Sequence, residues 1–117
     1  MLLMRTKRTL ENVLYSTASR QYDYTALQLT FDNTTLLALA WYFTGEARYA
    51  AHATKCVRTW FLDPFTKMNP HLTYAQVVLG HNRNVGARWG LIETKDFYYF
   101  LDALRLLRQS EVWHDED

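Results

Sequence analysis

The sequence predicts an all-α fold built from helical hairpins, and three features indicate it. Residues 33–44 and residues 46–62 each carry a helical pattern. A single glycine between them can provide the turn of a tight antiparallel hairpin. Residues 94–108 form a third helical segment with a wide apolar stripe. We therefore expect helices in these three places and no sheet beyond short bridges.

The first predicted helix, residues 33–44, is apolar nearly all the way round. Asp32 or Asn33 can cap its N-terminus. Gly45 stands where a helix needs a left-handed residue after its last turn, so we expect the helix to end at Thr44. A pattern without a polar face is typical of a buried helix. The apolar residues are Leu36, Leu37, Leu39, Ala40, Trp41 and Phe43.

The second predicted helix follows at once and covers residues 46–62. Glu46 favours its N-terminal turn, because a negative charge there complements the helix dipole. Small residues let this helix approach its neighbour closely. Pro64 cannot continue a helix and ends this one. The apolar face consists of Ala47, Ala50, Ala51, Thr54, Val57 and Phe61.

In the third predicted helix, Thr94 is expected to be the cap, with Asp96 in the first turn. Arg105 and Arg108 favour its C-terminal end. Its apolar stripe consists of Phe97, Phe100, Leu101, Leu104 and Leu107.

Two parts of the chain carry a weaker pattern. In residues 1–30, a helix at 8–19 followed by a break at 21–24 is one interpretation. Residues 65–92 have no sustained period, and loops of this length in compact domains are usually functional. The alternative, a disordered linker, is disfavoured by the Met, Leu, Tyr, Val and Trp content of the segment.

Composition excludes several classes of protein. The 117 residues suffice for one small domain, and the hydrophobic content of 49% argues against disorder. A net charge of +1 without a basic patch predicts no nucleic-acid partner, and no apolar run is long enough for a membrane span. The single cysteine, Cys56, excludes an internal disulfide. His52 and Cys56 have metal-ligand spacing on a helix but lack a third ligand, so we expect no metal and no cofactor.

Three blocks of sequence suggest a family. The first covers residues 37–50 and runs into Arg-Thr-Trp-Phe-Leu-Asp-Pro at 58–64. The second is Met-Asn-Pro-His-Leu-Thr-Tyr-Ala-Gln at 68–76. The third is Gly-Ala-Arg-Trp-Gly-Leu-Ile-Glu-Thr at 86–94, leading into residues 100–107. In this order and spacing the blocks resemble the alginate lyase superfamily of (α/α) toroid polysaccharide lyases.

The resemblance implies a partial (α/α) toroid from an enzyme that cleaves uronate-containing, alginate-like polysaccharide by β-elimination. We expect an unassigned segment at 1–30 and a partial lyase-like helical domain at 31–117, incomplete on its C-terminal side. The Asn-Asn-His-Gly motif of the family and its catalytic tyrosine lie downstream of the matching region. We therefore expect no catalytic residue in this chain and an inactive isolated chain. The resemblance also implies that the parent enzyme is secreted or periplasmic, although this chain shows no signal peptide.

Substrate-binding residues are expected in the second and third blocks. Tyr74 offers a ring for a sugar face and a hydroxyl, while Asn69 and Gln76 offer amide donors. His71 and Arg88 could also face substrate, with Arg88 pairing with a uronate carboxylate. Many relatives carry Gly-Arg in the third block, whereas here Ala87 separates Gly86 from Arg88. The alternatives are that these side chains brace their own loop, that His71 is merely solvated and that Arg88 forms a structural ion pair. Trp89 is expected to fill the core.

Two other functions remain open from sequence alone. The first is a helical-repeat interaction module, because residues 38–53 resemble one tetratricopeptide hairpin. That class needs stacked copies at a period of about 34 residues, and no second copy is present. The second is a non-catalytic pseudoenzyme that binds sugar without cleaving it.

Overall fold

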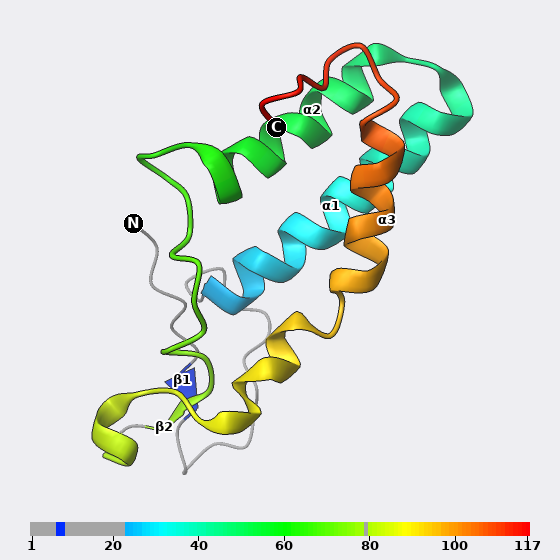
Figure 1. Ribbon diagram of the computed structural model, residues 1–117. Coiled ribbons are helices and arrows are strands. Elements are labelled where there is room, and N and C mark those ends of the chain that lie inside the picture. The colour runs from blue at the N-terminus through cyan, green and yellow to red at the C-terminus, as the bar shows by residue number, and fades with distance from the viewer. Residues whose placement is uncertain (1–6, 9–22, 79) are drawn as a thin grey trace.

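The computed structural model describes residues 7–8, 23–78 and 80–117 (Figure 1). This part of the chain is mostly helical, which confirms the predicted all-α class. Helices α1 (Asp23–Thr44) and α2 (Ala47–Val57) form an antiparallel hairpin, and α3 (Phe97–Leu107) packs against α1 (Figure 1). None of these helices is long and apolar enough to cross a bilayer.

Helix α1 begins nearly three turns earlier than the sequence predicts. The expected cap at Asp32 or Asn33 is wrong, because the helix already starts at Asp23. The predicted break at 21–24 is wrong for residues 23 and 24, which are helical. Leu27 and Phe31 are fully buried and extend the buried face upstream at helical spacing. Polar residues between them hid this face from a reading of the sequence.

The prediction that α1 is buried on all sides is also wrong. Leu36 is 65% exposed and Phe43 is 79% exposed, because α2 and α3 cover only the opposite side of the helix. The predicted end of α1 is confirmed. Gly45 has φ +71°, and its N–H donates to the Trp41 carbonyl oxygen at 2.7 Å.

The second predicted helix is confirmed to within one residue at its start. Helix α2 continues into a π-helical segment, η1 (Arg58–Leu62), so helical backbone runs from Ala47 to Leu62. Asp63 then adopts an extended conformation, as expected for a residue that precedes proline. The face toward α1 carries the small residues Ala50, Ala53 and Thr54.

The third helix starts later than predicted. Thr94 does not cap α3, because residues Arg88–Thr94 form a separate 3-10 segment, η3. Asp96 stands at the cap position, but its carboxylate pairs with Lys95 and makes no capping hydrogen bond. The Thr94 hydroxyl instead donates to the Leu91 carbonyl oxygen at 2.7 Å. Leu101, which was assigned to the apolar stripe, is exposed, while Ala103 is buried in its place.

The core consists of two adjoining clusters along the helices. The first is aromatic: the Phe31 ring lies 4.8 Å from the Phe100 ring between α1 and α3, centroid to centroid. The second is built mainly of alanines, which allow close helix packing. The buried members of the first cluster are Leu27, Phe31, Val57, Trp60 and Phe100, and those of the second are Ala38, Ala50, Ala53, Ala103 and Leu107.

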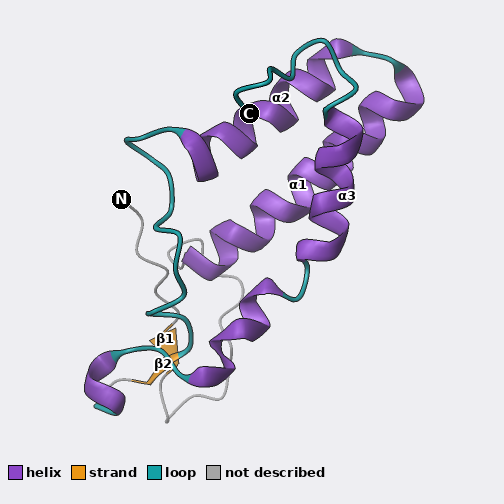
Figure 2. Cartoon of the chain, in the orientation of Figure 1, coloured by secondary structure: helices purple, strands orange, loops and turns teal. Residues whose placement is uncertain are grey.

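The segment between η1 and η3 is mostly loop and extends away from the turn of the α1–α2 hairpin (Figure 2). It contains the two-residue strand β2 (Val77–Val78), which pairs in parallel with β1 (Lys7–Arg8). This pairing is the only strand ladder in the described residues, as the prediction of short bridges requires. Arg8 lies in β1, and the rest of the predicted helix at 8–19 falls outside the described residues. A short 3-10 turn, η2 (Asn82–Asn84), follows β2.

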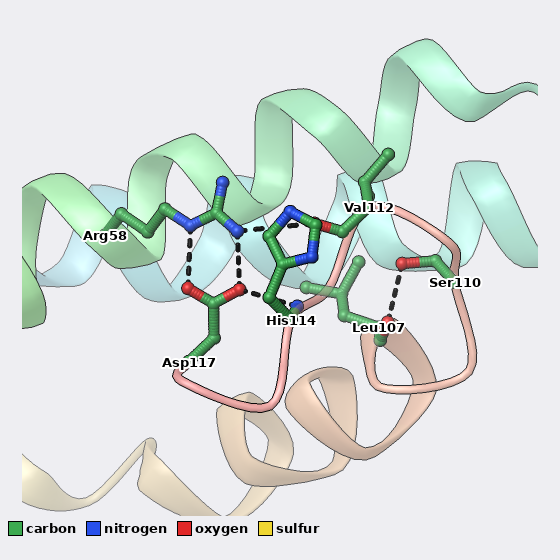
Figure 3. A network of polar contacts seen from close by, with 6 residues as sticks. All are labelled: Arg58, Leu107, Ser110, Val112, His114 and Asp117. Atoms are coloured by element: carbon green, nitrogen blue, oxygen red, sulfur yellow. Dashed lines mark hydrogen bonds and ion pairs between the residues drawn. The ribbon is translucent and has the colours of Figure 1, made fainter.

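The residues after α3 fold back onto the second helix through one ion pair (Figure 3). Arg58 donates to both carboxylate oxygens of Asp117, from Nε at 2.6 Å and from Nη2 at 2.5 Å. Arg58 Nη2 also donates to the Val112 carbonyl oxygen, and the His114 N–H donates to Asp117. These hydrogen bonds from Arg58 hold the pKa of Asp117 below its usual value.

Candidate functional site

The second and third sequence blocks, far apart in the loop, fold against each other. The Gly86 N–H donates to the Thr73 carbonyl oxygen at 2.6 Å, and the Ala87 N–H donates to the Ala75 carbonyl oxygen at 3.2 Å. This approach requires glycine, because a Cβ at position 86 would lie 2.2 Å from the Ala75 oxygen. The two blocks therefore form one structural unit, which we call the 73–90 unit after its outermost residues, Thr73 and Gly90.

A buried side-chain pair fixes one end of this unit. Gln76 Nε2 donates a short hydrogen bond to Glu93 Oε1, and the two side chains are 7% and 1% exposed. Burial raises the pKa of Glu93, while the hydrogen bond from Gln76 and the charge of Lys95 act in the opposite direction. The second carboxylate oxygen of Glu93 is buried and has no hydrogen-bond partner among the described residues.

Gln76 also has a strained backbone. Its φ is +57°, in the left-handed region that few residues other than glycine adopt. Its predicted role was to contact substrate with an amide donor. The structure shows one amide donor bound to Glu93, so Gln76 braces the loop here, and contact with substrate stays a prediction.

The other predicted residues of the second block are exposed or partly exposed. His71 is exposed, and Tyr74 is half-buried, with 6.2 Å between the centroids of the two rings. His71 Nδ1 accepts a hydrogen bond from the Thr73 N–H at 3.3 Å, so the imidazole also supports its own turn. Asn69 is partly exposed, but its amide nitrogen is buried and finds no hydrogen-bond partner in the part of the chain that the structure describes.

The segment that carries these residues is joined to the core at Met68. The Trp60 indole N–H donates to the Met68 sulfur at 3.0 Å, and the Met68 N–H donates to the Trp60 carbonyl oxygen at 2.8 Å. Trp60 is itself a member of the aromatic core cluster. The segment that carries Asn69, His71 and Tyr74 is therefore held by the helical domain at its start.

Arg88 and Trp89 open η3 and are both exposed. Among the described residues, no carboxylate lies within ion-pair distance of Arg88, so the structural ion pair that the sequence left open is not formed there. The expectation that Trp89 fills the core is wrong, because Trp89 is 52% exposed. Gly90, the next residue, is buried against Ala75 instead, which turns the indole outward.

The charge of this loop differs from that of the helices. The sequence has no aspartate or glutamate between Asp63 and Glu93, whereas Lys67, Arg83 and Arg88 lie there and are exposed. The parallel pairing of β1 places two more basic residues of the sequence beside β2. The loop region is therefore cationic, and it suits an anionic ligand. In the described part of the chain, no three His, Cys, Asp or Glu side chains gather where they could hold a metal ion.

Comparisons with known proteins agree with this picture. A family model described as alginate lyase matches residues 5–117. No curated protein gives a significant match. The crystal structure of an alginate lyase from Bacteroides ovatus is 38% identical in sequence and superposes with a TM-score of 0.78, covering 81% of this chain. The match spans only 25% of the Bacteroides ovatus chain. The likeness confirms the partial (α/α) toroid that the sequence blocks predicted, and the chain belongs to the alginate lyase family.

Proposed function

We propose that this chain is part of a polysaccharide lyase that cleaves uronate-containing, alginate-like polysaccharide by β-elimination. Its loop would form one wall of the substrate groove. The observation that carries the proposal is the 73–90 unit, in which two motif blocks of the alginate lyase family meet on an exposed loop that has no acidic residue. No comparison favours a helical-repeat module.

The chemistry of the reaction assigns a role to this wall. β-Elimination needs the C5 carboxylate of the uronate neutralised, the C5 proton removed and the leaving O4 oxygen protonated. An exposed guanidinium such as Arg88 can pair with a carboxylate through two parallel hydrogen bonds. The half-buried ring of Tyr74 can support a sugar face while its hydroxyl bonds a sugar oxygen. We propose Tyr74, Gln76, Asn69, Arg88 and His71 as the substrate-binding residues.

The proton-transfer groups are proposed to lie elsewhere in the enzyme. The sequence contains no Asn-Asn-His-Gly run, the motif that the family resemblance associates with catalysis. The wall would bind and orient the polymer, and a general base and acid from other segments would act on it. We therefore expect the isolated chain to bind a polyuronate without cleaving it.

Binding and cleavage can be measured separately. Titration with alginate should change the tryptophan fluorescence, while neutral dextran of similar length should not, and added salt should weaken the alginate signal. Arg88→Ser should lower alginate affinity, and Arg108→Ser, an exposed arginine at the end of α3, is the matched control. Steady formation of unsaturated uronate above a boiled control would show that the catalytic groups are present after all. Equal binding of dextran and alginate would refute the polyuronate proposal.

A further inference from the structure

Glu93 is a buried carboxylate to which the proposed saccharide wall gives no role. It lies at the end of η3, within the third sequence block, and is almost fully inaccessible to solvent. A buried carboxylate is costly unless its oxygens are hydrogen-bonded. Its Oε1 accepts a hydrogen bond from the amide of Gln76, a residue in the second block. This pair therefore joins the two blocks from inside the loop.

The Gln76–Glu93 contact lies at the residue of the turn whose backbone is most strained. Gln76 holds a left-handed backbone, and such a conformation persists only when its surroundings over-determine it. Two backbone hydrogen bonds, from Gly86 and Ala87, constrain the chain on the N-terminal side of Gln76. The bond to Glu93 constrains the side chain of Gln76 itself. Tyr74, two residues earlier, is presented by the turn that these contacts fix.

We propose that Glu93 is a positioning residue of the saccharide-binding wall: it fixes the Gln76 turn and thereby holds Tyr74 in place, without contacting the polymer. This proposal rests on the proposed function. If a binding face is in its binding-competent conformation only part of the time, the observed affinity falls in proportion to the fraction of molecules in that conformation. Loss of the Gln76–Glu93 contact should therefore weaken saccharide binding even though Glu93 is buried.

A swap of the two side chains tests the role. Gln76→Glu alone places two carboxylates in contact, so it should weaken binding of an alginate trisaccharide by about tenfold or more. The double variant Gln76→Glu/Glu93→Gln reverses donor and acceptor, so it should bind more tightly than Gln76→Glu alone. It should stay weaker than wild type, because the Gln76 amide is itself a proposed substrate contact. Glu93→Gln alone keeps an acceptor for Gln76 and should bind nearly as well as wild type. Glu111→Ala, an exposed glutamate after α3, is the control.

Hydrogen exchange provides a readout that needs no saccharide. The amide hydrogens of Gly86 and Ala87 should exchange about tenfold faster in Gln76→Glu, and the double variant should restore their protection. Unchanged exchange in Gln76→Glu would overturn the proposal. Restored exchange in the double variant with binding no tighter than in Gln76→Glu would also overturn it, because the restored turn would then contribute nothing to saccharide affinity. If the wild-type chain binds no alginate trisaccharide, the proposed function fails, and the exchange result alone decides whether Glu93 holds the turn.

Discussion

Replacing Gly86 by alanine should destabilise the chain by about 2–4 kcal/mol, because position 86 has no room for a side chain. A Cβ there would lie 2.2 Å from the Ala75 carbonyl oxygen and 2.8 Å from the Thr73 carbonyl oxygen. Both are backbone atoms that cannot rotate away. The two segments must therefore separate to accommodate a methyl group.

The magnitude follows from what that separation breaks. The hydrogen bonds from Gly86 to Thr73 and from Ala87 to Ala75 each contribute about 0.5–1.5 kcal/mol net. Overpacking at a tight site costs about 1–3 kcal/mol on its own, and partial relaxation offsets some of the sum. The net stability of a small domain is about 5–15 kcal/mol, so this loss should be readily measurable.

Gly80→Ala is the matched control for the Gly86 variant. Gly80 has φ +82°, but nothing lies within 4 Å of a Cβ built there, so the substitution adds only backbone strain of about 1–2 kcal/mol. Urea unfolding followed by tryptophan fluorescence should show a lower midpoint for Gly86→Ala than for Gly80→Ala. Equal midpoints for the two variants would refute the close packing of the 73–90 unit.

Three further predictions concern the helices. Burial and the carboxylate of Asp32 on α1 raise the pKa of Tyr99 to about 12. The stability of the fold should therefore fall as the pH rises from 10.0, the ordinary pKa of tyrosine, through about 12. Thermal melts in alkali should show no such loss for Tyr99→Phe. Arg58 lowers the pKa of Asp117, so the ion pair between them should stabilise the fold at neutral pH. This stabilisation should be lost as the pH falls below 3.8, the ordinary pKa of an aspartate. Asp117→Asn should be less stable at pH 7 and lose less stability in acid. The exposed Leu36 and Phe43 should cause weak self-association, which the double variant Leu36→Glu/Phe43→Glu should abolish. A wild-type chain that sediments as a monomer and binds no hydrophobic dye would contradict this.

Local signals predicted the ends of helices better than their starts. Gly45 and Pro64 stop their helices through backbone geometry that no tertiary contact can override, and both ends are where the sequence places them. The predicted start of α1 was wrong because Asp32 is a good cap by residue type, yet burial of Leu27 and Phe31 favours nearly three more turns of helix. Packing energy therefore outweighed a capping preference worth about 1 kcal/mol.

The same distinction explains the site. Residue types predicted which side chains could contact a sugar, and in the structure His71 and Arg88 are exposed and Tyr74 is half-buried. Sequence reasoning missed Glu93, although the residue lies in the third motif block, because a lone glutamate after two apolar residues carries no local signal for burial. Its partner Gln76 lies 17 residues away, and only the fold brings them together. By residue type alone, Gln76 reads as a substrate contact and Glu93 as an exposed charge. In the fold the two side chains are buried and hydrogen-bond to each other, so the role of each depends on the other.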